Sequence, residues 1–124
     1  MRRWIGVVAQ FVAVMGVLGL ATSGALAQGK GDATAGEAVY KAQCVKCHGD
    51  RGAGDGPQGQ KLKEKPSNWT AAGGGLKGMD DQKIFESIAK GGAAVGKSKA
   101  MPAYPKLSEA EVWSLVAYVK SLIK

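Results

Sequence analysis

The chain has 124 residues, of which 45% are hydrophobic, and 17 basic against 10 acidic residues give it a formal net charge of +7. This length is typical of one small domain, and no internal repeat or alternating strand pattern divides the sequence. The basic residues are spread along the chain rather than gathered in one block, which argues against a nucleic-acid-binding protein.

The first 27 residues have the pattern of a secretory signal peptide. Arg2 and Arg3 precede an apolar stretch that runs to about residue 21, and residues 25–27 form an A-x-A cleavage site. We therefore expect residues 1–27 to be a cleaved signal peptide and residues 28–124 to form the mature domain. Because the apolar stretch is slightly long, an uncleaved anchor that tethers the domain to the inner membrane is the alternative.

A first helix is predicted from about residue 35 to residue 45, with Asp32 or Thr34 as its N-cap. It ends in a C-x-x-C-H motif, the attachment signature for a c-type haem, formed by Cys44-Val45-Lys46-Cys47-His48. Two thiols three residues apart lie on one side of a helical turn, where each can form a thioether with one vinyl group of a single porphyrin. The residue after the second thiol is then the proximal iron ligand, and this histidine is the only one in the chain.

Two other readings of the motif are weaker. A zinc site needs further Cys or His ligands, and the sequence has none outside the motif. A thioredoxin-like dithiol needs strands and helices in alternation around it, which this sequence lacks. Exported thiols normally pair as disulfides, yet here a haem c would consume the only two cysteines. Export and haem attachment together indicate the periplasm of a bacterium.

Two more helices follow, separated by irregular segments. Asp80 is the predicted N-cap of a helix over residues 81–90, which Gly91 and Gly92 end. Ser108 and Glu111 form a capping box, from which a last helix is predicted to run to the chain end. The glycine-rich stretches 49–59 and 71–78 are predicted loops, which a porphyrin would order.

Two methionines remain after the signal peptide, and either sulfur is a possible sixth iron ligand. Met101 lies in an irregular, proline-containing segment just before the last helix, where the restricted backbone would hold a thioether against the iron. Met79 lies beside the cap of the second helix, a place where a methionine more often fills a gap in the core. Met101 is the preferred candidate.

In this order the features resemble those of the small bacterial class I cytochromes c, over the whole region from Gly36 to Leu122. The C-x-x-C-H motif, the Met-Pro pair and the L-x-x-Y stretch of residues 115–118 occur in the family's order, and Gly36 and Tyr40 match its glycine–aromatic pair. The resemblance implies an all-α cytochrome c fold, with about three to four helices around one covalently bound haem. It also implies that the first helix packs crosswise on the last.

The resemblance further implies which residues hold the haem. His48 and Met101 would be the axial ligands of the iron. In the family, a proline carbonyl accepts a hydrogen bond from the other nitrogen of the haem histidine; Pro57 is the first candidate here and Pro66 the alternative. Trp69 is expected either to line the haem and bond a propionate or to be an ordinary core residue.

These features indicate a one-electron carrier rather than an enzyme, because two axial ligands leave the iron no open position. Lysines 97, 99 and 106 flank the Met101 segment and Lys46 lies in the haem motif, so acidic docking patches are expected on redox partner proteins. Ordinary solubilising lysines are the simpler explanation of the same charges. A monomer is the default expectation. A haem enzyme or sensor with a weakly filled sixth position, and a subunit of a larger oxidase or dehydrogenase, are the other functions considered.

Overall fold

The structure, a computed structural model, describes residues 30–72 and 74–123. Its elements are, in chain order, α1 (Ala33–Gln43), α2 (Val45–His48), the 3-10 helix η1 (Gly59–Lys61), α3 (Asp81–Lys90), the 3-10 helix η2 (Gly92–Val95) and α4 (Glu109–Ser121). Within the described ranges there is no β-strand, so the predicted all-α fold is confirmed. The predicted signal peptide lies outside the described residues.

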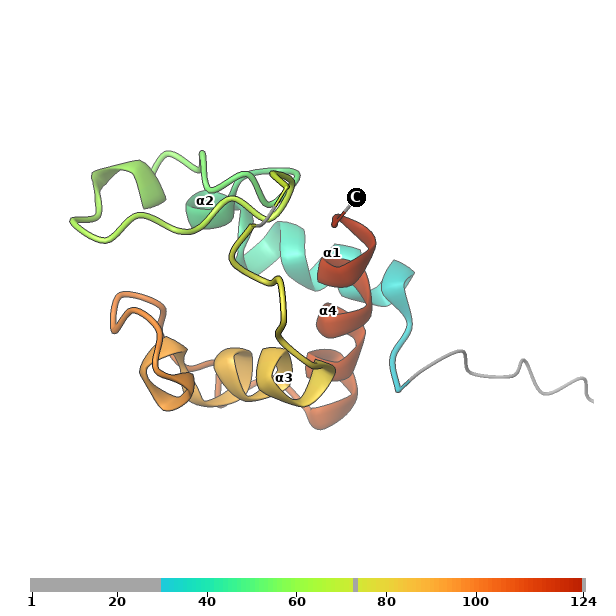
Figure 1. The fold of residues 1–124 in the computed structure, drawn as a ribbon. Coiled ribbons are helices and arrows are strands. Elements are labelled where there is room, and N and C mark those ends of the chain that lie inside the picture. Colours follow the sequence, from blue (N-terminus) through green and yellow to red (C-terminus); the bar gives the residue numbers. More distant parts are fainter. Residues whose placement is uncertain (1–29, 73, 124) are drawn as a thin grey trace, which may run out of the picture.

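Two arms extend from the pair of helices α1 and α4 (Figure 1). The upper arm contains α2, η1 and the loop that leads on to residue 72, and the lower arm contains α3, η2 and the segment that leads into α4. None of the helices in residues 30–72 and 74–123 has the length and hydropathy that a membrane span requires.

Helices α1 and α4 cross at close range because of one glycine. A Cβ atom at Gly36 would lie 1.9 Å from the carbonyl oxygen of Ser114, so only hydrogen fits between the two backbones. One turn further along α1, Tyr40 is fully buried, with its ring centroid 5.1 Å from that of Tyr118. The tyrosine hydroxyl donates a hydrogen bond of 2.6 Å to the carbonyl of Gly49, which ties α1 to the chain after the haem motif. The predicted packing of the glycine–aromatic pair on the last helix is confirmed.

The helix starts follow the sequence signals. Asp32 caps α1 and Asp80 caps α3 through their side chains. Both hydrogen bonds of the capping box between Ser108 and Glu111 are present at the start of α4. Helix α3 has the predicted bounds and ends at Gly91, whose φ of 90° suits glycine and stops the helix.

The structure differs from the prediction at the haem motif and at the chain end. The first predicted helix is two helices, because the backbone of Cys44 (φ −109°) departs from regular helix geometry before α2 begins at Val45. Helix α4 ends at Ser121 instead of at the last residue. The short helices η1 and η2 escape sequence analysis because three or four residues carry no periodic pattern.

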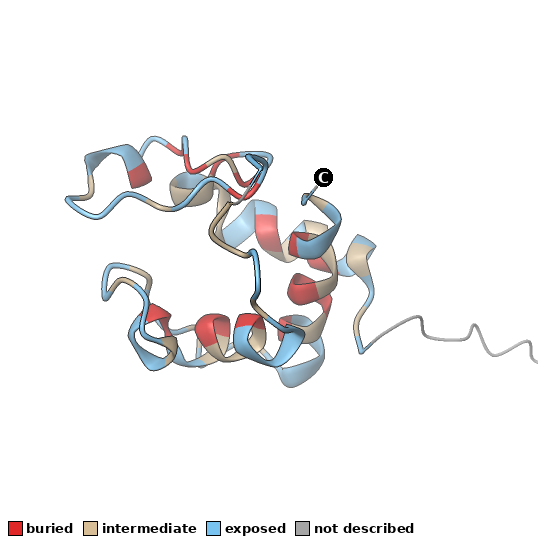
Figure 2. Ribbon diagram, in the orientation of Figure 1, coloured by how far each residue is buried: buried red, intermediate tan, exposed pale blue. Residues whose placement is uncertain are grey.

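The buried apolar side chains form one cluster across these elements. Buried positions lie on the inward faces of α3 and α4 and on α1 (Figure 2). The cluster consists of Tyr40, Trp69, Ile84, Ile88, Val112, Leu115, Val116 and Val119. Helices α3 and α4 therefore supply most of the core.

Candidate haem site

The junction between α1 and α2 positions the C-x-x-C-H motif. The amide of Cys44 donates to the carbonyl of Tyr40 at 2.8 Å and closes the last turn of α1, while the Cys44 carbonyl accepts from the amide of His48 at 2.9 Å. This single turn brings Cys44, Cys47 and His48 to the wall of one cavity. Both thiols are half-buried and form no disulfide.

The cavity has a volume of about 290 Å³ and is lined by residues of both arms. Most of its wall is apolar, with side chains from α3, α4 and the two loops: Leu62, Leu76, Ile84, Ile88, Leu115 and Val119. Two thiols and an imidazole at one end of an apolar cavity are the groups that a c-type haem needs. The residues present therefore fit a covalently attached porphyrin.

The imidazole of His48 has the buried, neutral state that suits a metal ligand. Burial lowers the pKa of its imidazole to about 4, so the ring is neutral at pH 7, the form that coordinates iron. Its Nδ1 atom is buried and has no hydrogen-bond partner among the described residues. The ring stacks against Trp69, with the two ring centroids 4.4 Å apart and the planes inclined by 29°.

The structure does not support Pro57 as the proline beside the haem histidine. Pro57 is exposed and does not line the cavity. The chain lies against the backbone of α2 at Gly56, where a Cβ atom would be 2.5 Å from the carbonyl oxygen of Val45, and the next residue is exposed to solvent. Pro66, the alternative, is half-buried and lines the cavity. Neither proline carbonyl accepts a hydrogen bond from His48 Nδ1, so such a bond from the histidine to the carbonyl of Pro66 stays a prediction.

Met101 lines the same cavity from the lower arm. Its carbonyl accepts a hydrogen bond from the amide of Gly92 at 3.1 Å, and the amide of Tyr104 donates to the carbonyl of Ile88 at 3.1 Å. These two bonds tie the segment from Met101 to Tyr104 to the last turn of α3 and the start of η2. The side chain of Met101 is half-buried.

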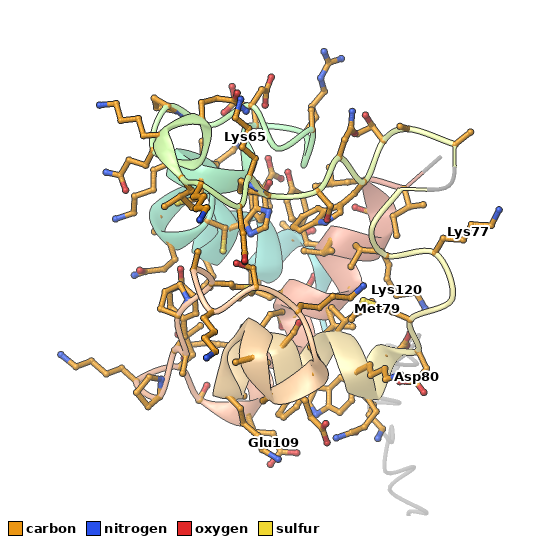
Figure 3. The ribbon with its side chains drawn as sticks, turned by 60° about the vertical axis from the view of Figure 1, so that its left-hand side comes forward. Lys65, Lys77, Met79, Asp80, Glu109 and Lys120 are labelled. Atoms are coloured by element: carbon orange, nitrogen blue, oxygen red, sulfur yellow. The ribbon has the colours of Figure 1, made fainter. Side chains whose placement is uncertain are left out.

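Met79 also lines the cavity, although the sequence favours a plain packing role for it. It directly precedes the cap residue Asp80 at the start of α3 (Figure 3) and packs against the core cluster. Both methionine sulfurs are therefore near the place of the haem, and the assignment of Met101 as the ligand stays a prediction.

Two aromatic residues complete the cavity wall. Trp69 is 8% exposed within the core cluster and also lines the cavity, so its position is compatible with either role, and a bond to a propionate stays a prediction. Sequence reasoning does not single out Tyr104, which is half-buried, lines the cavity and donates a long 3.4 Å hydrogen bond to the carbonyl of Gln43. The position of Tyr104, two residues after the Met-Pro pair, is the sequence signal that could have indicated a place in the cavity wall.

Comparison with known proteins agrees with this site. The family model described as "Cytochrome C oxidase, cbb3-type, subunit III" matches residues 31–119. The chain belongs to this family. It is a small bacterial class I cytochrome c that carries one covalently attached c-type haem and serves in electron transfer.

The curated relatives are oxidase subunits. The cbb3-type cytochrome c oxidase subunit FixP of Bradyrhizobium diazoefficiens is 34% identical over 93 residues, covering 73% of this chain and 28% of the relative. Subunit CcoP of Azospirillum sp. is 34% identical over 99 residues, covering 74% of this chain and 29% of the relative. The chain thus spans less than a third of either protein. A chain of the reducing HAO-like protein complex of Kuenenia stuttgartiensis has the same fold, with a TM-score of 0.60 and 27% identity over 76% of this chain and 44% of that one.

Proposed function

We propose that this cytochrome is an exported one-electron carrier that passes electrons between larger redox complexes. One observation carries the proposal: Cys44, Cys47 and His48 from the upper arm line the same cavity as Met101 from the lower arm. In this proposal the two thiols hold the haem and His48 and Met101 are its axial ligands. The haem supplies a one-electron couple between ferric and ferrous iron.

The proposed ligand pair favours a carrier over an enzyme. The thioether of Met101 would occupy the sixth position, so that oxygen, peroxide or a substrate finds no open site on the metal. The apolar wall of the cavity would exclude water from the site, and a methionine ligand favours the ferrous state and raises the potential. The protein then determines potential, access and docking.

Lysines at the mouth of the cavity support docking to an acidic partner. Lys65 of the upper arm and Lys97 of the lower arm line the cavity, and the acidic residue in the lining is Glu64. Further exposed lysines stand close to these in the sequence: Lys61, Lys63 and Lys99. A positive rim of this kind steers a protein toward a negative surface, and such redox interfaces are small and short-lived.

Charge reversal tests the docking proposal. Lys97→Glu should slow electron transfer to the physiological partner and weaken its dependence on ionic strength. Lys77→Glu is the matched control, because Lys77 projects from the loop before α3 and does not line the cavity (Figure 3). Equal rates for the two variants would show that the cavity rim is not the docking surface.

We also propose that residues 1–27 are removed after export and that residues 28–124 act in the periplasm. The A-x-A sequence at residues 25–27 supports cleavage. The mass of the protein recovered from its host distinguishes this proposal from an uncleaved membrane anchor.

A second proposal is that the chain works as a bound subunit of a cbb3-type oxidase. The names of its relatives favour this role. A tagged chain purified from its host after mild detergent treatment would then bring oxidase subunits with it. A chain recovered alone in the soluble fraction would support the free carrier.

Optical spectra test the proposed ligands directly. The oxidised wild-type protein should show an iron–sulfur charge-transfer band, should not bind carbon monoxide when reduced, and should lose the band in Met101→Ala. A high-spin ferric spectrum with ready carbon monoxide binding in the wild type would contradict the carrier proposal and indicate a catalyst or a sensor.

A further inference from the structure

The indole of Trp69 packs against the imidazole of His48, with the ring centroids 4.4 Å apart and the planes 29° from parallel. Trp69 is 8% exposed. Trp69 comes from the loop of the upper arm, not from helix α2, which carries the histidine. The contact is therefore a tertiary one, which the haem motif does not itself impose.

A haem histidine is usually oriented through the ring nitrogen that does not face the metal, which donates a hydrogen bond to a carboxylate or a carbonyl. In residues 30–72 and 74–123, the Nδ1 atom of His48 is buried and meets no such acceptor. The ring's aromatic neighbour is Trp69. Stacking of two aromatic rings favours particular relative orientations of their planes.

Trp69 is itself held firmly. Its amide donates a 2.8 Å hydrogen bond to the carbonyl of Gly52. A Cβ atom at Gly52 would lie 2.4 Å from Cε3 of the indole, so the glycine leaves the space that the indole fills. The fully buried ring of Tyr40 lies 6.4 Å from the indole at an angle of 58°. The indole thus packs against Tyr40 of α1 and against the loop that contains Gly52.

We propose that Trp69 is a positioning residue for His48, because its stacked indole fixes the plane of the imidazole; this role is separate from the hydrogen bond that Nδ1–H is predicted to donate to a proline carbonyl. This inference rests on the proposed role of His48 as an iron ligand. It differs from the family-based expectation for Trp69, which is a hydrogen bond from the indole nitrogen to a haem propionate. Stacking requires the flat ring, whereas the propionate bond requires the N–H group.

A pair of substitutions separates the two roles. Trp69→Phe keeps an aromatic ring without the N–H group, and Trp69→Leu removes both. The readout is the proton NMR spectrum of the oxidised protein, because the order and spread of the haem-methyl resonances depend on the orientation of the axial ligand planes. We expect Trp69→Phe to keep the wild-type pattern and Trp69→Leu to change it. Equal changes in both variants would assign Trp69 to the propionate, and no change in Trp69→Leu would overturn the proposal.

A second variant pair serves if Trp69→Leu does not fold. Gly52 and Gly96 have nearly the same positive φ, 74° and 72°, but a Cβ atom at Gly96 meets nothing within 4 Å. Gly52→Ala should displace the indole and change the haem-methyl pattern, whereas Gly96→Ala carries the backbone strain alone and should leave it unchanged. The same pattern in both glycine variants would contradict the proposal.

The wild-type spectrum separates a failure of this inference from a failure of the proposed function. A wild-type protein without a low-spin, histidine-bound haem would refute the proposed ligands. A wild-type protein with that haem, whose pattern is insensitive to Trp69→Leu and Gly52→Ala, would refute the stacking role alone.

Discussion

The two segments that meet at the cavity are built in different ways. The His48 segment is helical and short, and a buried tryptophan covers its imidazole. The Met101 segment is irregular, its neighbours Pro102 and Ala103 are exposed, and one backbone hydrogen bond attaches it to α3 and another to η2. One side of the proposed iron site is thus defined by local sequence, and the other by contacts between distant parts of the chain.

This difference has consequences for the stability of the two proposed ligands. A segment with few buried contacts and exposed backbone opens at a lower free-energy cost than a helical segment in the core. We therefore expect the Met101 side to yield first to heat, denaturant or a competing ligand. The bond to His48 should persist in the partly opened protein.

The largest effect should come from removing both thiols. The double substitution Cys44→Ala with Cys47→Ala eliminates the covalent attachment, so the haem should be absent from a denaturing gel and from the mass of the protein. Without it a domain of this size keeps a large apolar cavity, and its cooperative unfolding should be lost. Either single substitution leaves one thioether and is the control. Haem retained on the gel in the double variant would contradict the attachment.

The next effect should come from Met101. Met101→Leu should lower the midpoint potential by a sizeable part of the roughly 0.8 V range over which axial ligands set haem potentials. Met79→Leu is the matched control, since Met79 lines the same cavity and leucine replaces methionine at little cost in packing. Redox titration of both variants decides between the two sulfurs. A larger drop in Met79→Leu would exchange their roles.

A smaller effect should come from Tyr104, which joins the Met101 segment to α1. Its 3.4 Å hydrogen bond to the Gln43 carbonyl is long, so we expect Tyr104→Phe to lose no more than about 1 kcal/mol. Added imidazole would bind the iron in place of the methionine, so a less firmly held Met101 segment should raise the affinity for imidazole. A loss of about 1 kcal/mol corresponds to at most about a fivefold gain in that affinity. Tyr118→Phe is the control, because Tyr118 does not line the cavity. Equal affinities in the two variants would show that Tyr104 does not hold the segment.

The contrast between local patterns and tertiary contacts also explains which features could be predicted from the sequence. The helix caps and the glycine stop of α3 are local patterns, and the structure has the corresponding helix ends where the sequence places them. The stack of Trp69 on His48 and the role of Tyr104 depend on how loops fold back on the helices, which no local pattern encodes. The choice between Pro57 and Pro66 could not be made from the sequence for the same reason, since the path of a glycine-rich loop depends on its tertiary contacts.

The smallest effect should be a pH dependence of the unfolding free energy. It arises from the capping box of Ser108 and Glu111, which begins α4 just after the Met101 segment. The amide and the hydroxyl of Ser108 donate to the Glu111 carboxylate at 2.7 Å and 2.9 Å, and these bonds lower the pKa of Glu111. Because the folded pKa is lower, their stabilisation is complete above the unfolded pKa of about 4.3 and is lost as the pH falls through the folded value.

Glu111→Gln keeps a capping acceptor that does not titrate. The difference in unfolding free energy between wild type and Glu111→Gln should therefore be largest near neutral pH and should shrink below about pH 4. In a Ser108→Ala background this pH dependence should be smaller but should persist, since the hydroxyl donor to the carboxylate is lost while the backbone amide of residue 108 can still donate. Following the iron–sulfur band and the haem-methyl resonances in the same acid titration extends the test to the two segments. If acid perturbs the His48 resonances before the Met101 band weakens, the Met101 side is not the weaker one, and the contrast between the segments is wrong.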